Sequence, residues 1–337
     1  MRWELTAEQD DFRSVLRDWL AEHCAPNLRG WLDSGDLDPF EREFVSAGWF
    51  SVGSPEELGG QGGGLVELAL VAEELGRAAA PSSAWLGSVV TVPGLATAPE
   101  AAKALLADGV TTVLAVPADS VPGATSGGAV RTVLGADRAQ RLLVPTRQGL
   151  ALVDTEDVEL RPRGLVDRTR TVADVTFSND PDAVLPADAL PGMALRAAVL
   201  TAADSLGVAE RVLDMAVEYT VQRQQFGVPI GSFQAVKHAA AEMLVQVEAA
   251  RSIVFLAAAS VEAGHPDAVK HAAAAKAQVT AGVAGAVDTA LTLHGAIGYT
   301  WEHDLQLFYK RAKLNRVLFG SPERWNERLA SELDLVP

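Results

Sequence analysis

Two acidic residues stand where a proton could be moved. Asp204 interrupts the apolar run AVLTAADSLGVA, and Glu302 lies in TWEHD. A carboxylate at either place could act as a general base. Each also has a structural interpretation. Glu302 opens a predicted helix, where a carboxylate is favourable against the helix dipole, and Asp204 suits a buried, hydrogen-bonded position, because burial without partners is costly. We expect the structural roles, with catalysis by one of the two as the alternative.

An arginine and an aromatic ring come close in RQQFG, where Arg223 precedes Phe226. A guanidinium fork beside an aromatic ring suits a diphosphate. The plainer interpretation is a solvated or ion-paired arginine on the surface of a helical bundle. His238, His294 and His303 have neither metal-ligand spacing nor a nucleophile beside them, and no GxSxG or HExxH occurs. The sequence therefore predicts no metal site.

The first third of the chain is predicted to be helical. Thr6, with Gln9 three residues later, forms a capping-box pattern before apolar residues at helical spacing. Further helices are predicted over 38–47 and 65–78. The glycine cluster Gly59 to Gly64 fits neither GxGxxG nor GxxxxGKS/T, and no strand clearly precedes it. We interpret it as a loop rather than a phosphate cradle.

Short β-branched runs follow from about Thr111 and predict a small β-domain of sandwich or barrel type. From Pro191 the chain is rich in alanine, with helices predicted over 191–222, 233–263, 266–293, 301–318 and 322–333. Long antiparallel helices with short connections predict a four-helix bundle. The predicted fold class is α+β, with a helical domain over 1–108, a β-domain over 109–188 and the bundle over 189–337. Arg311, Lys313 and Arg316 are expected to complement a helix dipole.

Composition excludes several classes of function. A chain of 337 residues with 48% apolar content can build two or three globular units. The formal net charge of −16 repels nucleic acids and anionic membrane surfaces. The single cysteine, Cys24, excludes an internal disulfide and fits a reducing compartment, so we expect a cytoplasmic protein. We see no signal peptide and expect no apolar run as long as a membrane span.

Three stretches carry the most specific sequence patterns, one in the predicted N-terminal helical domain and two in the predicted bundle. RQQFGVPIGSFQAVKHAAAEM, residues 223–243, and LHGAIGYTWEHDLQLFYKRAK, residues 293–313, resemble the two C-terminal signatures of the acyl-CoA dehydrogenase family. GWFSVGSPEELGGQGGGLVELALVAEELGRAAAP, residues 48–81, resembles its N-terminal helical domain. The resemblance implies the acyl-CoA dehydrogenase fold and oxidation of an acyl-CoA to its 2,3-enoyl form. In that reaction a glutamate removes a proton and FAD takes a hydride.

In this family the flavin lies between the β-domain of one subunit and the bundle of its neighbour. The resemblance assigns the neighbour-facing contacts to Arg223, Phe226, Phe233, Gln234, Thr292 and Gly295. Thr292 stands where a glutamine is usual, and Ala296 replaces the second glycine of a pair. The β-domain departs further. Its stretch LAVPADSVPGATSGG replaces a TEPxAGSD-like loop, and no tryptophan occurs between Trp85 and Trp301. The expected cofactor is FAD, shared with a partner subunit.

The two positions that carry the family's base are both apolar. Most members place the glutamate in a YEGT-like turn after the basic helix, and the aligned LFGS puts Phe319 there. A minority carry the base near the start of the first helix of the bundle, where this chain has Ala197. The resemblance thus implies that no residue of this chain is the catalytic base.

This pattern resembles the truncated subunits of actinobacterial heteromeric acyl-CoA dehydrogenases, which form α2β2 assemblies. The resemblance implies a full-length acyl-CoA dehydrogenase subunit as partner, an acyl-CoA substrate such as a steroid side-chain thioester, and an electron-transfer flavoprotein or similar acceptor. Nucleic acid and membrane are not expected partners. Two alternatives stay open: a self-sufficient homomeric enzyme using Asp204 or Glu302, and a flavin-free scaffold that binds CoA thioesters.

Overall fold

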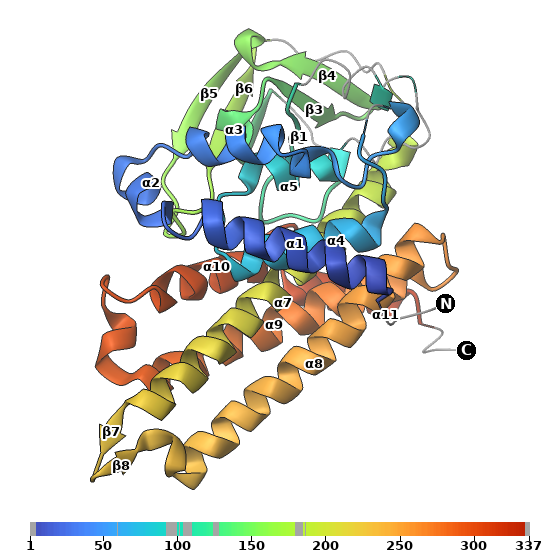
Figure 1. Ribbon diagram of the computed structural model, residues 1–337. Coiled ribbons are helices and arrows are strands. Elements are labelled where there is room, and N and C mark those ends of the chain that lie inside the picture. The colour runs from blue at the N-terminus through green and yellow to red at the C-terminus, as the bar shows by residue number, and fades with distance from the viewer. Residues whose placement is uncertain are drawn as a thin grey trace.

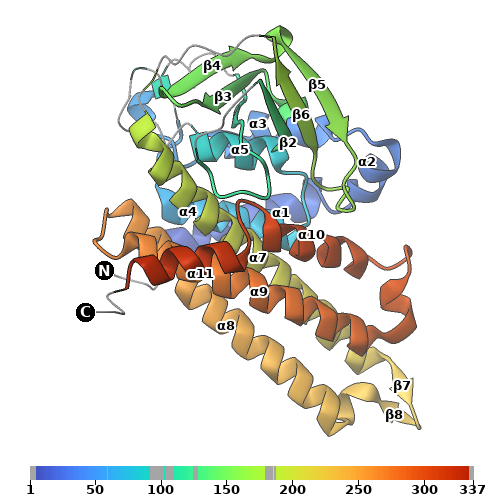
Figure 2. The ribbon, with the colours of Figure 1, turned by 180° about the vertical axis from the view of Figure 1, so that it is seen from behind.

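The computed structural model describes residues 5–58, 60–91, 100, 102–103, 110–123, 128–178, 185 and 187–333. Strands β1 to β6 lie at one end of the molecule and the long helices α7 (Leu190–Gln222), α8 (Gln234–Glu262) and α9 (Ala268–His294) at the other, with α1 (Ala7–His23) and α4 (Leu65–Arg77) between them (Figures 1 and 2). The predicted α+β class and its three-part organisation are confirmed. The boundaries at 108/109 and 188/189 stay predictions, and the first lies outside the described residues.

The N-terminal part contains the helices α1 (Ala7–His23), α2 (Leu28–Ser34), α3 (Asp38–Ser46), α4 (Leu65–Arg77) and α5 (Ser83–Thr91). The capping box at Thr6 is confirmed, because its side chain accepts from the Gln9 amide and the Gln9 side chain accepts from the Thr6 amide. Helices α2 and α5 were not predicted. Every residue of α5 is buried, so its sequence carries no amphipathic period to find.

The glycine-rich loop ends at the N-terminus of α4, where protein carboxylates occupy the free amides. The Gly64 amide donates to Glu67 Oε2 at 2.7 Å, and the Val66 amide donates to Glu262 Oε2 at 3.1 Å. A helix N-terminus favours negative charge, and here side chains supply it. The loop interpretation is confirmed from Gly60 onward, and Gly59 lies outside the described residues.

Helices α4 and α7 (Leu190–Gln222) cross in backbone contact. A Cβ atom on Gly76 would lie 2.1 Å from the Asp204 carbonyl oxygen, and one on Gly207 would lie 1.8 Å from the Glu73 carbonyl oxygen. Only glycine fits at such a crossing. This contact seats the N-terminal helices on the bundle and brings Glu73 and Asp204 to the junction.

The β-domain consists of two three-stranded sheets. One has the order β1-β3-β4 and the other β2-β6-β5. Strands β1 and β3 are parallel, and the remaining pairs within these two sheets are antiparallel. The strands are β1 (Thr112–Leu114), β2 (Ala129–Leu134), β3 (Arg141–Pro145), β4 (Leu150–Asp154), β5 (Val158–Arg163) and β6 (Val172–Phe177). Residues of both sheets, including Val113, Leu142 and Val175, share one buried apolar cluster, as in a sandwich.

The C-terminal part is the predicted bundle. Its helices after α7 are α8 (Gln234–Glu262), α9 (Ala268–His294), α10 (Leu305–Val317) and α11 (Pro322–Ser331). A hairpin of β7 (Gln224–Gln225) and β8 (Val228–Pro229) joins α7 to α8. The helix predicted from residue 301 begins at Leu305, because a 3₁₀ segment, Gly295–Tyr299, and a turn precede it.

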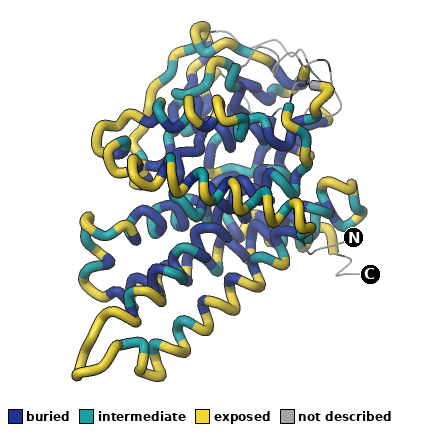
Figure 3. The backbone as a smooth tube through the Cα atoms, viewed as in Figure 1, coloured by how far each residue is buried: buried dark blue, intermediate teal, exposed yellow. Residues whose placement is uncertain are grey.

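Two described segments, Ala187–Gln222 and α8, are long and apolar enough to cross a membrane by length and composition. The prediction that no apolar run reaches that length is therefore wrong. In the first segment 83% of the most apolar window is buried, as expected for a core helix, but in α8 only 39% is buried. The outer ends of α7 and α8 and the hairpin between them form the exposed tip in Figure 3. Helix α8 thus leaves apolar surface uncovered.

Candidate functional site

Phe319 closes the turn between α10 and α11. Its side chain is 1% exposed and belongs to the main apolar core. Its amide donates to the Ala118 carbonyl of the β-domain at 2.6 Å, and its carbonyl accepts from Trp325 Nε1 at 2.9 Å. The backbone has φ +55°, which is uncommon for a non-glycine residue and is held here by contacts on both sides. The turn is packed with hydrocarbon where the family signature expects a carboxylate.

Lys276 of α9 forms hydrogen bonds that stabilise the turn containing Phe319. Its buried Nζ donates to the carbonyls of Asn315 and Arg316 in the last turn of α10 and of Gly320 in the turn that follows, at 2.8–3.3 Å. Burial, with a further contribution from Arg316, lowers the pKa of Lys276 to about 7. An ammonium group among converging carbonyls satisfies acceptors that the helix end leaves free. Sequence analysis missed Lys276, because a lysine among alanines looks like a solvated position.

Ala197, the second position for a base, is fully buried on α7. Its carbonyl accepts from Thr201 Oγ1 at 2.7 Å, a bond within the helix. A methyl group has no proton to exchange. Both positions that the resemblance assigns to the family's base thus carry buried apolar side chains.

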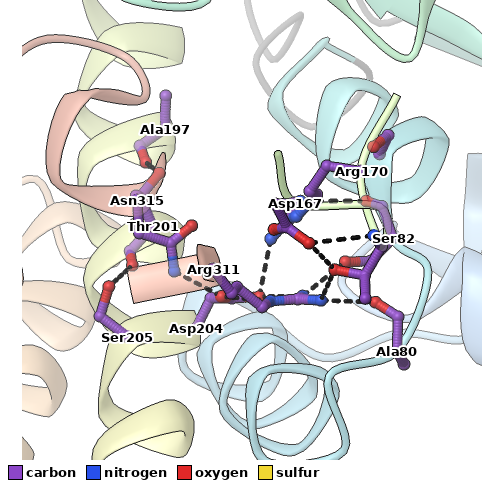
Figure 4. Close-up of polar contacts among 12 residues, drawn as sticks. Ala80, Ser82, Asp167, Arg170, Ala197, Thr201, Asp204, Ser205, Arg311 and Asn315 are labelled. Carbon is purple, nitrogen blue, oxygen red and sulfur yellow. Dashed lines mark hydrogen bonds and ion pairs between the residues drawn. The ribbon is translucent and has the colours of Figure 1, made fainter. Parts of the chain in front are cut away.

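Asp204 sits on α7 at the centre of a buried polar cluster (Figure 4). Its Oδ1 accepts from Arg311 Nε at 2.9 Å and from Asn315 Nδ2 at 2.6 Å. Its Oδ2 accepts from Arg311 Nη2 and from Arg170 Nη2, the latter at 2.8 Å. Burial raises the pKa of Asp204, but Arg311 and Arg170 outweigh it and hold the pKa below the usual value. Four donors bind its two oxygens, so the carboxylate is ionised and its hydrogen-bonding capacity is occupied. The structural interpretation of Asp204 is the one the geometry supports.

Arg311 connects the three parts of the molecule. It donates to Asp204 of the bundle, to the Ala80 carbonyl and Ser82 Oγ of the N-terminal part, and to Thr169 of the β-domain. Arg311 lies before the last turn of α10 and pairs with Asp204, so the prediction that it complements the dipole at a helix C-terminus is wrong. The missed signal was Asp204 itself, since an aspartate in an apolar run requires a buried cation. Lys313 binds Asp288 and Arg316 binds Glu323.

Glu302 lies far from the base position. It is exposed, precedes α10, and its carbonyl accepts from Arg29 Nη2 at 2.6 Å. Phe319 follows the other end of α10, a helix of 13 residues or about 20 Å at 1.5 Å per residue. The carboxylate of Glu302 therefore cannot replace a base at position 319. The predicted role at a helix start is also wrong, because α10 begins three residues later with Asp304 at its N-cap.

The predicted neighbour-facing residues gather at the exposed tip of the bundle. Arg223 is exposed at the C-terminus of α7, and no described carboxylate lies within ion-pair distance of its guanidinium. Phe226 is 93% exposed with φ +54° and contacts Phe233 edge-on, at 6.2 Å between ring centroids. Gln234 opens α8 with an exposed side chain. A free guanidinium, an exposed ring and an exposed amide fit the diphosphate end of FAD.

Thr292 and Gly295 lie at the end of α9. Thr292 is exposed, although its hydroxyl donates to the Asp288 carbonyl of its own helix at 3.0 Å. Gly295 ends α9 with φ +61°, and no atom lies within 4 Å of where a Cβ would stand. The backbone there is open to an approaching group. The tertiary structure thus keeps all six predicted residues accessible without a partner in place.

The β-domain offers different side chains from the exposed tip of the bundle. A hollow of about 680 Å³ lies beside residues 116–123 and β2, and its lining includes Asp119, Ser120 and Arg131. Part of the stretch that replaces the TEPxAGSD-like loop, residues 124–127, lies outside the described residues. The lining residues supply one carboxylate and no aromatic ring. Among the described residues, this lining does not fit the task of covering a flavin ring, whereas the exposed tip of the bundle fits the diphosphate end of FAD. Among the described residues no three His, Cys, Asp or Glu side chains gather to hold a metal ion.

Two family models match the chain on either side of the β-domain. Residues 6–106 match the acyl-CoA dehydrogenase N-terminal domain, and residues 194–333 match the acyl-CoA dehydrogenase C-terminal domain. The chain belongs to the acyl-CoA dehydrogenase family. Members of this family are oxidoreductases that normally bind FAD.

Acyl-CoA dehydrogenases of mycobacteria are close relatives in sequence. IpdE2 of Mycobacterium tuberculosis is 37% identical over 281 residues, which cover 83% of this chain and 81% of the relative. IpdE2 of Mycolicibacterium smegmatis is 36% identical over 333 residues, which cover 98% of this chain and 100% of the relative. The similarity thus runs through the β-domain as well as the two helical parts.

Two solved structures share the fold. A chain of the ChsE4-ChsE5 complex from Mycobacterium tuberculosis matches with a TM-score of 0.89 at 24% identity, over the full length of both chains. A chain of the Tcur3481-Tcur3483 steroid ACAD, in a G363A variant, matches with a TM-score of 0.86 at 27% identity, over 96% of this chain and 97% of that chain. The first match shows the fold alone, because its identity is low.

Proposed function

We propose that this chain is the subunit of a heteromeric acyl-CoA dehydrogenase that completes the FAD site of a full-length partner. FAD, when bound, accepts a hydride from the acyl chain. The partner supplies the base and the β-domain that covers the flavin ring. This chain supplies Arg223, Phe226, Phe233 and Gln234 to bind the diphosphate end. The observation that carries the proposal is Phe319, buried at the base position of a chain whose neighbour-facing residues remain exposed.

The apolar surface at the same tip supports a partner. Leu244 and Val245 of α8 are 50% and 68% exposed, and Val217 and Val221 of α7 are 43% and 64% exposed. Between these helices lies a groove of about 390 Å³, lined by Leu213, Val217, Ala240, Ala241 and Leu244 together with Asp214 and Glu218. Exposed apolar surface of this kind marks an interaction site. Small and aliphatic side chains at helical spacing fit the bundle of a second acyl-CoA dehydrogenase subunit.

The homomeric alternative lacks a base. Asp204 is saturated by four donors, and Glu302 lies at the other end of α10 from Phe319. A base must be able to reach the substrate proton and accept it, and neither carboxylate meets that requirement. The flavin content of the assembled complex distinguishes the flavin-free scaffold from the half-site subunit.

The remaining parts of the proposal concern chemistry outside this chain. The substrate class is an acyl-CoA, and a steroid side-chain thioester is supported by the likeness to a chain of a steroid ACAD. We propose an α2β2 assembly, an electron-transfer flavoprotein or similar acceptor, and a cytoplasmic location.

The test is to co-express the chain with full-length acyl-CoA dehydrogenase subunits of its host and count FAD in the purified complex by absorbance after denaturation. We expect one flavin for each pair of unlike chains and no flavin on this chain purified alone. One flavin per chain, or flavin reduction by an acyl-CoA with this chain alone, would refute the half-site proposal. A stable mixed complex without flavin would favour the scaffold.

A further inference from the structure

Three aromatic side chains stack where α7 and α9 end together. The Tyr219 and His294 rings lie 4.6 Å apart between centroids with an interplanar angle of 22°, and His303 meets His294 edge-on at 4.8 Å. Tyr219 is in the last turn of α7, His294 is the last residue of α9, and His303 lies just before α10. His294 is 2% exposed. A stack of this kind fixes the separation of the elements that carry it.

The stack lies between the two segments of the proposed flavin half-site. The Arg223 amide donates to the Tyr219 carbonyl at 2.8 Å, so Arg223 follows Tyr219 within one helical turn. On the other side, Gly295 follows His294 directly and Thr292 precedes it by two residues. Behind the ring, a Cβ on Gly298 would lie 3.1 Å from His294 Cβ, which shows how closely that backbone packs on the histidine. Movement of His294 would therefore change the distance from Arg223 to the end of α9.

His294 is an unusual choice for a buried stacking residue. Its Nδ1 lies 2.8 Å from the Ala290 carbonyl, and a carbonyl only accepts, so Nδ1 carries the proton in the neutral ring. Its Nε2 is buried and faces the Met215 carbonyl of α7, but the geometry falls short of a hydrogen bond. The other groups that face the ring are Tyr219 and the imidazole of His303, and neither is a carboxylate. A second proton on His294 would be buried without a counter-charge.

We infer that His294 is a positioning residue of the flavin half-site: its stack with Tyr219 and His303 sets the spacing between Arg223 and Gly295. This inference rests on the proposed function and names a residue that does not itself touch the flavin. Burial lowers the pKa of His294, with the imidazole of His303 contributing in the same direction. The folded state favours the neutral ring, so the positioning is fully present above the ordinary histidine pKa and is lost as the pH falls through the lowered pKa of the folded state.

Two variants separate stacking from hydrogen bonding. His294→Phe keeps an aromatic ring and removes both nitrogens, whereas His294→Leu removes the ring. His271→Leu is the matched control, because His271 also stacks on a histidine, at 5.8 Å from His265, but lies near the opposite end of α9. We expect FAD to bind the complex of His294→Leu about tenfold more weakly. The His294→Phe and His271→Leu complexes should stay within about twofold of wild type.

Two further readouts would not respond to a loss of general stability. FAD retention by the wild-type complex should fall as the pH is lowered through the depressed pKa of His294, and retention by His294→Phe should not. In the full chain without FAD, His294→Leu should raise hydrogen exchange at the amides of residues 219–225, and His271→Leu should leave it unchanged. A wild-type complex without FAD would refute the proposed function. A wild-type complex that binds FAD, with His294→Leu unchanged in affinity and exchange, would overturn this inference alone.

Discussion

Arg311 on α10 donates hydrogen bonds from Nε and Nη2 to the two carboxylate oxygens of Asp204 on α7, although the two residues are 107 positions apart in the sequence. Arg170 and Asn315 complete the set of donors. Both charged partners are essentially without solvent contact. The contact joins the bundle to the N-terminal helices and the β-domain at one point, and it removes Asp204 from the list of groups that could accept a substrate proton.

Replacing Asp204 should therefore act on stability. We expect Asp204→Ala to lower the free energy of unfolding by about 3–5 kcal/mol, because Arg311 and Arg170 would remain buried without a counter-charge. Urea denaturation followed by circular dichroism measures it. Asp288→Ala, which removes the exposed partner of Lys313, should cost less than about 1 kcal/mol. Equal effects of the two variants would contradict the assigned role of Asp204.

Glu73 gives the protein a pH dependence at the junction of α4 and α7. Burial, followed by the charge of Glu210, raises the pKa of Glu73 to about 8, and its Oε2 has no hydrogen-bond partner. The folded-state pKa lies above the ordinary value, so this contribution to stability is complete below the ordinary value and is lost as the pH rises through about 8. We expect the free energy of unfolding to fall by about 1–3 kcal/mol between about pH 6 and pH 9.

The variant Glu73→Gln should remove most of that fall, because an amide does not ionise. Glu248→Gln is the control, since Glu248 lies beside the same Arg251 but its side chain is 61% exposed. Urea midpoints at the two pH values give the comparison. The same loss of stability in wild type and Glu73→Gln would assign the pH dependence to another group.

Phe319 should be needed for packing rather than chemistry. We expect Phe319→Ala to cost about 3–5 kcal/mol, as for other buried aromatic residues. Phe319→Glu should cost at least as much, because its carboxylate would replace core hydrocarbon, and it should not let the isolated chain reduce flavin with an acyl-CoA. Val317→Ala, at a 37% exposed position of the same helix end, should cost less than about 1 kcal/mol. Stable, active Phe319→Glu would show that this subunit retains a working acyl site.

Arg223 should matter only in the assembled complex. We expect Arg223→Ala to weaken FAD binding by the complex about 10- to 100-fold, the range for loss of a hydrogen bond to a charged group. The melting temperature of the isolated chain should not change, because Arg223 has no described ion-pair partner in this chain. Arg324→Ala on α11 is the control, since Arg324 is 72% exposed and distant in sequence from the half-site. Unchanged FAD affinity would show that Arg223 is an ordinary surface residue.

We expect the exposed face of α8 to contact the partner subunit. Val245→Asp is expected to weaken assembly with the partner subunit by about tenfold or more, because it would bury an unpaired charge at the interface. Val15→Asp on α1 is a matched control at a position of similar exposure, 59% against 68%. Size-exclusion chromatography of the co-expressed chains measures the assembled fraction. Loss of assembly in both variants, or in neither, would contradict the placement of the interface at the tip of the bundle.

The sequence predicted the features that depend on local spacing. The capping box at Thr6 and the long helices of the bundle follow from turn-by-turn patterns, and the structure places them within a few residues of the prediction. The strands were visible as β-branched runs between turn residues. The prediction that this chain lacks the base also came from the sequence, because the resemblance assigns Phe319 to one position in a recognisable signature. Helix α5 was not predicted, because a helix buried on all sides shows no hydrophobic period in its sequence.

Only the tertiary structure decided which polar residues face one another. Nothing in the local sequence pairs Asp204 with Arg311, because their contact depends on how α7 and α10 pack although the two residues are 107 positions apart. For the same reason no local pattern reveals the contacts of Lys276 or His294. By itself the sequence determined the family, the order of the three parts and the apolar base positions. Packing determined that Asp204 is neutralised by buried arginines and that Arg223 is left exposed, because burial and ion pairing are properties of surfaces brought together from distant segments.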